Sequence, residues 1–246
     1  MNNQRAFEGK VALVIGGSRG IGAAIAKRFA TAGASVALTY ARSPERAAET
    51  ARAAQAQGVP AIAIRADSTD ARDLQEAVAS TMARFGRLDI LVVNAGILMH
   101  GTVDSFPLED FDRMFATNVR GVFVAIQACV PHLADGGRII TIGSNTAVRT
   151  AFAGASVYSM TKGAVAAMIR GVAIDLAPRG ITANNVQPGP TATDMTAGLV
   201  ELVTPLVPLG RIGKPEEIAG LVAYLASAEA GYITGASLTI DGGYVA

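Results

Sequence analysis

A tyrosine and a lysine stand four residues apart in SVYSMTKGA, residues 156–164. If this stretch is helical, Tyr158 and Lys162 are neighbours on one face of the helix. A phenol can donate or accept a proton, and a nearby positive charge favours its ionised form. The pair could therefore serve as a general acid and base, or it could be an incidental pair on a helix surface.

The glycine-rich stretch GGSRGIG, residues 16–22, offers a second kind of chemistry. It follows the apolar run 11–15 and precedes an Ala-rich segment of helical period. Glycines at such a turn let the backbone approach a pyrophosphate, and the helix N-terminus supplies N–H groups and partial positive charge. The spacing is G-x-x-x-G-x-G and not the G-x-G-x-x-G of the dinucleotide fingerprint. Nucleotide binding is therefore indicated by the place of the turn between the first expected strand and helix, and a purely structural turn is the alternative.

Other chemistries find little support in the composition. Only 17% of the 246 residues are charged and the net charge is +1, which argues against nucleic acid or an anionic membrane as a partner. His100 and His132 stand apart from other ligand-type residues, so no metal site is expected. Neither GASVY nor IGSNT forms the G-x-S-x-G turn of a serine hydrolase. We expect a small-molecule partner.

The location of the protein is also an expectation from composition. The N-terminus lacks the apolar core of a signal peptide, and no apolar run reaches the roughly 18 residues of a membrane span. The lone Cys129 cannot form an internal disulfide. The sequence therefore predicts a soluble, cytoplasmic protein.

The elements that must position these groups follow an alternating pattern. Short aliphatic runs alternate with segments of helical period, which predicts crossover units and a parallel sheet. Helices are expected to begin near Gly20, Pro44, Asp70, Pro107, Ser156 and Pro215. The expected strands are 11–15, 35–40, 61–66, 89–95, 137–144, 181–189 and 237–241. We predict an α/β fold in which residues 1–246 form one doubly wound domain, with about seven parallel strands and helices on both faces.

One segment departs from this alternation. Residues 190–213 carry three prolines, show no clear period and directly follow an expected strand. A long insert at the carboxyl end of a parallel strand is typical of a lid that closes on a ligand. Met195, Leu199 and Leu202 would give this lid an apolar wall.

Taken in order, the motifs resemble those of the single-domain, NAD(P)-dependent short-chain dehydrogenases/reductases, and in particular carbonyl reductases of the 3-oxoacyl-ACP reductase kind. The likeness covers nearly all of the chain. The glycine turn is similar to TGxxxGIG, VNAG (93–96) to NNAG, and PGPTAT (188–193) to PG-x-x-x-T, while Asn118, Ser144, Tyr158 and Lys162 match the catalytic set. The resemblance implies a Rossmann fold with strand order 3-2-1-4-5-6-7.

The resemblance also implies roles for the catalytic set. Tyr158 would exchange a proton with the substrate oxygen, and Lys162 would lower the pKa of Tyr158 and bind the nicotinamide ribose. Ser144 would steady the substrate oxygen, and Asn118 would hold a water of the proton relay. A strand-end cap for Ser144 and a helix hydrogen-bonding role for Asn118 are the alternatives.

The size of the available interaction energies limits how far Lys162 can lower the pKa of Tyr158. Bringing a phenol of pKa about 10 near neutrality requires about three units, or roughly 4 kcal/mol. An exposed helical pair supplies only about 0.2 to 0.5 kcal/mol, whereas a unit charge about 4 Å away at an effective dielectric near 20 supplies about 4 kcal/mol. Lys162 therefore suffices only in a partly dry site where a positive nicotinamide ring helps.

The implied cofactor contacts are spread over the whole carboxyl edge of the sheet. For Asp67 and Thr193, a helix cap and an ordinary loop residue are the alternatives. Besides Tyr158 and Lys162, the set comprises Gly16, Ser18, Arg19, Gly20, Ile21, Gly22, Tyr40, Arg42, Asp67, Ser68, Asn94, Ala95, Gly96, Pro188, Gly189, Thr191 and Thr193.

The cofactor is expected to be NADP(H). An NAD enzyme would place a carboxylate about twenty residues beyond the turn, on the ribose 2′-hydroxyl; Tyr40 stands there instead. Arg19 and Arg42 can pair with a 2′-phosphate, unless they are simply two solvated arginines.

Three positions depart from the family pattern. Ile15 and Val93 replace the usual Thr and Asn, which removes polar groups that brace the cofactor turn and the fourth strand. Ser144 lies fourteen residues before Tyr158, where thirteen is commoner. None of the three is a reacting group.

The favoured function is an NADPH-dependent reductase of carbonyls, of ketone or 3-oxoacyl type. The alternative is a regulatory protein that binds a nucleotide on the same fold without turnover. The resemblance further implies a homotetramer that pairs the helices expected at 107–132 and 156–178.

Overall fold

A seven-stranded parallel sheet forms the centre of the molecule. The computed structural model describes residues 5–150 and 152–246. Every neighbouring pair of strands is parallel, in the order β3-β2-β1-β4-β5-β6-β7, which confirms the predicted fold and strand order. The strands are β1 (Val11–Ile15), β2 (Ser35–Tyr40), β3 (Ala61–Arg65), β4 (Leu88–Val93), β5 (Leu133–Ile142), β6 (Thr182–Pro188) and β7 (Ser237–Ile240). The fifth strand thus begins earlier than the expected residue 137.

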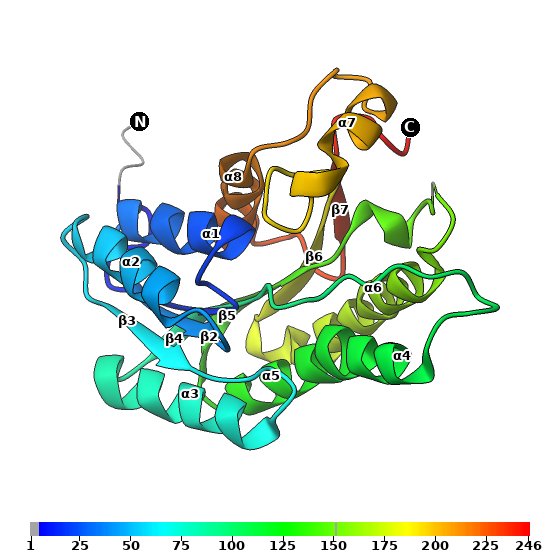
Figure 1. Ribbon diagram of the computed structural model, residues 1–246. Coiled ribbons are helices and arrows are strands. Elements are labelled where there is room, and N and C mark those ends of the chain that lie inside the picture. The colour runs from blue at the N-terminus through cyan, green and yellow to red at the C-terminus, as the bar shows by residue number, and fades with distance from the viewer. Residues whose placement is uncertain (1–4, 151) are drawn as a thin grey trace.

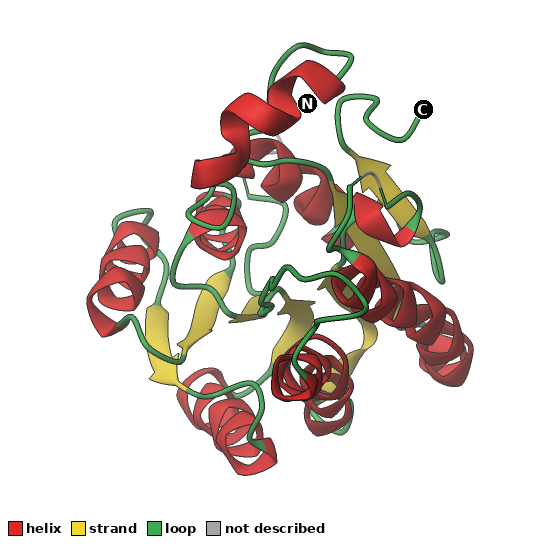
Figure 2. Ribbon diagram, turned by 45° about the vertical axis from the view of Figure 1, so that its right-hand side comes forward, coloured by secondary structure: helices red, strands yellow, loops and turns green. Residues whose placement is uncertain are grey.

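Helices cover both faces of the sheet (Figures 1 and 2). One layer contains α1 (Gly20–Thr31), α2 (Pro44–Gln55) and α8 (Pro215–Ala226); the other contains α3 (Ala71–Phe85), α4 (Leu108–Phe115), α5 (Gly121–Cys129) and α6 (Ser156–Leu176). Val14 packs into the first layer and Leu13 into the second, because successive side chains of a strand point to opposite faces. Strands buried on both faces explain the continuous apolar runs of the sequence.

The ends of the helices follow the local sequence. Pro44 and Pro215 occupy the first turns of α2 and α8, where a missing N–H does no harm. Asp70 caps α3 by accepting a hydrogen bond from the amide of Arg72 at 2.8 Å. Gly86 ends the same helix in the left-handed conformation, with φ 74°.

The long helix expected over 107–132 is interrupted. A π-helical segment, Ala116–Arg120, separates α4 from α5, and α5 ends at Cys129. Such π segments occur frequently at functional sites, and this one carries Asn118. No change in the hydrophobic periodicity of the sequence predicts this π-helical segment.

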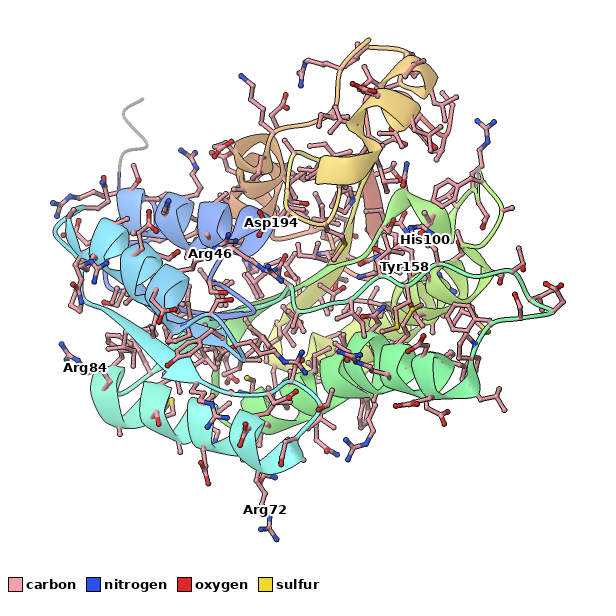
Figure 3. All side chains as sticks on the ribbon, in the orientation of Figure 1. Arg46, Arg72, Arg84, His100, Tyr158 and Asp194 are labelled. Atoms are coloured by element: carbon pink, nitrogen blue, oxygen red, sulfur yellow. The ribbon has the colours of Figure 1, made fainter. Side chains whose placement is uncertain are left out.

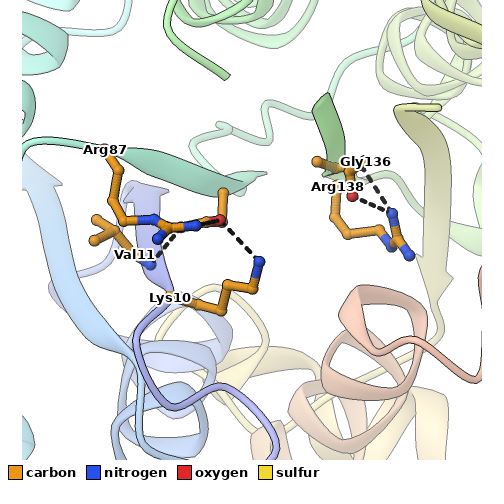
Figure 4. Close-up of polar contacts among 7 residues, drawn as sticks. Lys10, Val11, Arg87, Gly136 and Arg138 are labelled. Atoms are coloured by element: carbon orange, nitrogen blue, oxygen red, sulfur yellow. Dashed lines mark hydrogen bonds and ion pairs between the residues drawn. The ribbon is translucent and has the colours of Figure 1, made fainter. Parts of the chain in front are cut away.

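A buried carboxylate joins β1 to β4 at the amino end of the sheet. Asp89 is 4% exposed and accepts hydrogen bonds from the Val11 amide at 3.0 Å and from Arg87 at 2.6 and 2.8 Å (Figure 4). Lys10 Nζ lies 3.1 Å from it. Burial raises the pKa of Asp89, but the hydrogen bonds from Arg87, Val11 and Lys10 outweigh burial and hold that pKa below its usual range. This end of the sheet is therefore fixed by charge, opposite the edge where the candidate site lies.

Two kinds of feature are not found in the described part of the chain. None of its helices combines the length and apolar character required to cross a bilayer. Residues 5–150 and 152–246 contain no group of three His, Cys, Asp or Glu side chains arranged to hold a metal ion.

Candidate functional site

A cavity of about 930 Å³ lies at the carboxyl edge of the sheet. It extends from the glycine turn after β1 to the start of α6, and the segment 190–213 forms part of its wall. All the predicted site residues line this cavity except Gly22 and Asn118, which lie directly behind the lining. Clefts at this edge of an open α/β sheet are the usual ligand sites of such folds.

The glycine turn is packed so closely that side chains are excluded. A Cβ atom at Gly22 would lie 2.1 Å from the carbonyl oxygen of Gly16 and 2.6 Å from Asn94 Nδ2. Gly16 has φ 78°, and a Cβ there would lie 2.9 Å from the Ala95 backbone. The N-terminus of α1 has no side-chain cap, so its amides are available to an anion. The turn thus fits the diphosphate of a dinucleotide.

The brace that Ile15 and Val93 cannot supply comes from elsewhere. Thr39 Oγ1, on β2, accepts a hydrogen bond from the Gly16 amide at 3.0 Å. Asn94 Nδ2 donates to the Gly16 carbonyl at 2.7 Å. Ile15 and Val93 themselves are fully buried in the core and aligned in register on β1 and β4. Thr39 is not among the residues predicted from the sequence, because a threonine inside one strand gives no sign that it bonds to the turn after the neighbouring strand.

Tyr158 and Lys162 lie together on the first turns of α6. Lys162 Nζ is 5.6 Å from the centroid of the Tyr158 ring and donates to the carbonyl oxygen of Ile142, at the end of β5, at 3.1 Å. The lysine is only 5% exposed, which excludes the interpretation as a pair on an outer helix surface. A Cβ at Gly96 would lie 3.4 Å from Lys162 Nζ, so a glycine there leaves room for the ammonium.

Burial shifts the pKa of Tyr158 and the pKa of Lys162 away from their ordinary values. Desolvation raises the pKa of Tyr158 to about 12, an effect only partly offset by a hydrogen bond with Ser144. Desolvation lowers the pKa of Lys162 to about 8. The lowered pKa expected for Tyr158 is therefore not a property of the protein by itself, because desolvation outweighs the hydrogen bond with Ser144. At neutral pH the phenol carries its proton.

Ser144, directly after β5, is oriented by the neighbouring Thr146. Its hydroxyl oxygen accepts hydrogen bonds from the Thr146 amide at 3.2 Å and from Thr146 Oγ1 at 2.9 Å. A serine hydroxyl has two lone pairs and one proton, so the proton remains for donation into the cavity. Ser144 therefore does cap a short 3₁₀ turn (Asn145–Ala147), and it still has a donor left.

Asn118 connects the helical layer to the chain after β4. Its amide accepts from the Ile97 backbone N–H at 2.8 Å and donates to the Ile97 carbonyl at 2.9 Å. A further hydrogen bond reaches Thr161 Oγ1, on α6, at 3.2 Å. Asn118 is fully buried, and its bonds run to α6 and to the loop after β4 rather than within its own helix.

Asp67 lines the far end of the cavity. Its carboxylate accepts from the Thr69 amide at 2.9 Å and from Thr69 Oγ1 at 2.8 Å. These two hydrogen bonds, with smaller contributions from Arg42 and Arg65, lower the pKa of Asp67. The cap of α3 is Asp70, so the helix-cap alternative for Asp67 is wrong.

The other end of the cavity is largely apolar. Leu202 is 66% exposed and is not among the lining residues, so the expectation that it forms the wall is wrong; Val203 takes that place. His100 and Tyr158, both labelled in Figure 3, line the same cavity. Arg149 also lines the cavity here and donates to the Tyr244 carbonyl at 3.2 Å. The apolar and aromatic residues that line this end are Leu98, His100, Phe152, Met195, Leu199, Val203 and Tyr244.

Tyr244, in the C-terminal segment, also lines the cavity. It is not among the site residues predicted from the sequence. Asp241, just after β7, accepts hydrogen bonds from the Gly243 amide at 3.0 Å and the Val245 amide at 3.1 Å. Asn145 Nδ2, next to Ser144, donates to the same carboxylate at 3.3 Å. The turn after β7 is thereby tied to the loop that carries Ser144. No short sequence pattern predicts this connection, because it depends on contacts between residues far apart in the chain.

Three charged side chains meet where the glycine turn faces α2. Arg19 of the turn lies 3.2 Å from Asp194 of the segment 190–213, and Arg46, in the first turn of α2, contacts the same carboxylate (Figure 3). Arg19, Arg42 and Asp194 line the cavity beside Tyr40. Arg46 was missed because its sequence context, SPERA, is that of an ordinary exposed helix start.

Similarity to known proteins agrees with this geometry. A family model described as enoyl-(acyl carrier protein) reductase matches residues 15–245. A short-chain dehydrogenase/reductase from Serratia marcescens BCRC 10948 is 55% identical, with a TM-score of 0.96 over 98% of this chain and 100% of that chain. A short chain dehydrogenase from Burkholderia cenocepacia J2315, solved in complex with NADP, is 47% identical, with a TM-score of 0.96 over the same shares.

A further relative bears a different kind of name. The cyclic-di-GMP-binding biofilm dispersal mediator protein of Escherichia coli (strain K12) is 44% identical over 242 residues, covering 97% of this chain and 98% of that protein. Identity at this level over nearly the whole length, together with the family model, leaves one assignment. The chain is a member of the short-chain dehydrogenase/reductase family.

Proposed function

We propose that the protein reduces a carbonyl group, of ketone or 3-oxoacyl type, with NADPH, and oxidises the corresponding alcohol in reverse. The observation that carries the proposal is the Tyr158 phenol, which lines the cavity together with Lys162 and Ser144. A protein that only binds a nucleotide has no need of a phenol and an ammonium held together in a dry site. The apolar end of the cavity favours a substrate with an apolar or aromatic substituent.

The proposed mechanism assigns one task to each side chain. Ser144 donates a hydrogen bond to the substrate oxygen, and Tyr158 delivers its proton there during reduction. Lys162 stabilises the resulting phenolate, and Asn118 holds the relay region in place through Ile97. NADPH would supply the hydride and, once oxidised, a positive ring near the phenol. Proton transfer back to Tyr158 then comes from the solvent side.

The proposed cofactor is NADP(H), held by the set predicted from the sequence. The glycine turn and the N-terminus of α1 would bind the diphosphate, and Asp67 and Ser68 would lie at the adenine. Thr193 lies against the turn, since a Cβ at Gly20 would be 3.2 Å from its methyl group. Arg19 and Arg42 would bind the 2′-phosphate, and Arg46 joins them in this proposal.

An absorbance assay tests this function directly. A panel of ketones and 3-oxoacyl thioesters is offered with NADPH and, separately, with NADH. We expect oxidation of NADPH with at least one apolar or aromatic carbonyl, and a higher kcat/KM with NADPH than with NADH, because no carboxylate follows β2 to repel a phosphate. Equal or better use of NADH would contradict the cofactor assignment, and an inactive panel would contradict the enzyme assignment.

The second candidate is a regulatory protein that binds a nucleotide without turnover. The printed name of the Escherichia coli relative supports it, as does the set of arginines at one end of the cavity. On this alternative, the wild-type protein reduces no carbonyl in the panel, and removal of the Tyr158 hydroxyl leaves its cellular effect unchanged.

We also propose that the protein forms a homotetramer. Phe123 on α5 is 49% exposed and Ile174 on α6 is 76% exposed, which suits surfaces that become buried between copies. Sedimentation at micromolar concentration should show a tetramer of the 25.1 kDa chain, and Phe123→Asp should shift it toward smaller species. A wild-type protein that sediments only as a monomer would refute this.

A further inference from the structure

Asp194 lies between two arginines that belong to other parts of the chain. It follows Thr193 in the segment 190–213, whereas Arg19 comes from the glycine turn and Arg46 from α2. The three side chains are each a little more than half exposed, at 55%, 59% and 52%. The contact therefore joins the lid to both elements that flank one end of the cavity.

The arrangement has the chemistry of an anion site already filled from within the chain. Hydrogen bonding and charge from Arg46, and then the charge of Arg19, lower the pKa of Asp194, so the carboxylate is ionised near neutral pH. Two guanidinium groups around one anion are what recognition of a phosphate monoester requires. A phosphate offers more charge and three acceptor oxygens, whereas the carboxylate offers two.

The internal contact is also weak enough to exchange. Ion pairs between exposed side chains contribute little to stability and are screened by salt. The lid has a stronger attachment of its own, since Gly213 and residues 190–192 are hydrogen-bonded backbone to backbone at 2.8 and 2.9 Å. Loss of the Asp194 contact would therefore free Arg19 and Arg46 without detaching the segment.

We propose that Asp194 competes with the 2′-phosphate of the cofactor for Arg19 and Arg46, and thereby tunes the preference for the phosphorylated cofactor. The inference rests on the NADP(H) site proposed above. The carboxylate acts as a built-in rival of the phosphate, so its removal strengthens binding of 2′-phosphorylated nucleotides and leaves the unphosphorylated ones unchanged.

Calorimetry with two small probes tests the proposal without any turnover. Adenosine 2′,5′-bisphosphate carries the 2′-phosphate and 5′-AMP lacks it; neither contains the nicotinamide. Asp194→Asn should bind adenosine 2′,5′-bisphosphate about two- to tenfold more tightly than the wild type, the range that two exposed ion pairs allow, with 5′-AMP unchanged. The gain in affinity should become smaller as the salt concentration is raised from about 50 to about 500 mM, because salt screens the interactions between exposed charges.

Two further variants make the result specific. Glu201→Gln removes another acidic side chain of the lid, one that neither lines the cavity nor forms an ion pair within the described residues, and should leave both affinities unchanged. Arg46→Ala should weaken binding of adenosine 2′,5′-bisphosphate selectively and reduce the gain from Asp194→Asn, because only Arg19 is then left for Asp194 to occupy.

The outcomes separate this inference from the proposed function. Unchanged or weaker binding of adenosine 2′,5′-bisphosphate by Asp194→Asn overturns it, as does an equal change for both probes, which would mean that Asp194 only shapes the lid. If the wild-type protein binds 5′-AMP but gains nothing from the 2′-phosphate, the NADP(H) assignment itself is wrong.

Discussion

Tyr158→Phe should lower kcat by at least about a hundredfold, the lower end of what a positioned general acid contributes. The substitution removes one oxygen and almost no volume, so folding and NADPH binding should be retained. The loss follows because Tyr158 is the phenol that lies next to both Ser144 and Lys162 in the cavity lining. Single-turnover kinetics with a substrate found in the panel would measure it.

A second tyrosine provides the control. Tyr232 is fully exposed, so Tyr232→Phe should leave both kcat and KM unchanged. Titration with NADPH would show that Tyr158→Phe still binds the cofactor, which excludes a general disruption of the cavity. Near-normal kcat in Tyr158→Phe would contradict the assignment of Tyr158 as the general acid.

Lys162→Met should reduce turnover by about a hundredfold or more, since it removes the charge that stabilises the phenolate. It should also weaken NADPH binding, because Lys162 is assigned a ribose contact. The expected signature is thus a fall in both kcat and cofactor affinity, whereas Tyr158→Phe affects kcat alone.

The same variant makes a prediction about stability and pH. Burial lowers the pKa of Lys162 to about 8 from an ordinary value of 10.5. Between these two pH values the unfolded chain holds a proton that the folded chain has lost, so the free energy of unfolding of the wild type gains from rising pH. The penalty at neutral pH is on the order of 3 kcal/mol, and Lys162→Met removes it together with its pH dependence.

Urea unfolding at several pH values between 7 and 10 would check this. The difference in free energy of unfolding, wild type minus Lys162→Met, should become more positive as pH rises. Lys27→Met, which changes an exposed lysine on α1, should show no such trend. A difference that stays constant with pH would mean that Lys162 titrates normally.

Much of the fold was predictable because the signal is local. The run VALVI and its counterparts are continuous apolar stretches, and a strand covered on both faces requires that pattern. The turn at Gly16 and Gly22 was predictable for a similar reason, since only glycine fits where a Cβ would strike backbone. In such cases the cause lies within a few residues of the effect.

The rest depends on contacts that no short stretch of sequence contains. Thr39 braces the turn from the next strand, and Arg46 meets Asp194 across 148 positions of the chain. The raised pKa of Tyr158 in the protein without a cofactor could not be predicted, because the sequence gives the type of its neighbours but not the extent of desolvation. Leu202 was placed on the wrong face because the segment 190–213, with its three prolines, shows no clear period.

The stem at the base of the lid has a consequence for how this chain can diversify. The backbone of Gly213 accepts a hydrogen bond from Ala192 and donates one to Pro190, and Thr191 pairs with Gly213. The two ends of the loop are therefore held together whatever lies between them. Because doubling the length of a closed loop costs only about 0.6 kcal/mol, we expect that evolution or loop grafting can exchange residues 195–211 as a unit, which would change the substrate end of the cavity while Thr193, Asp194 and the sheet stay in place.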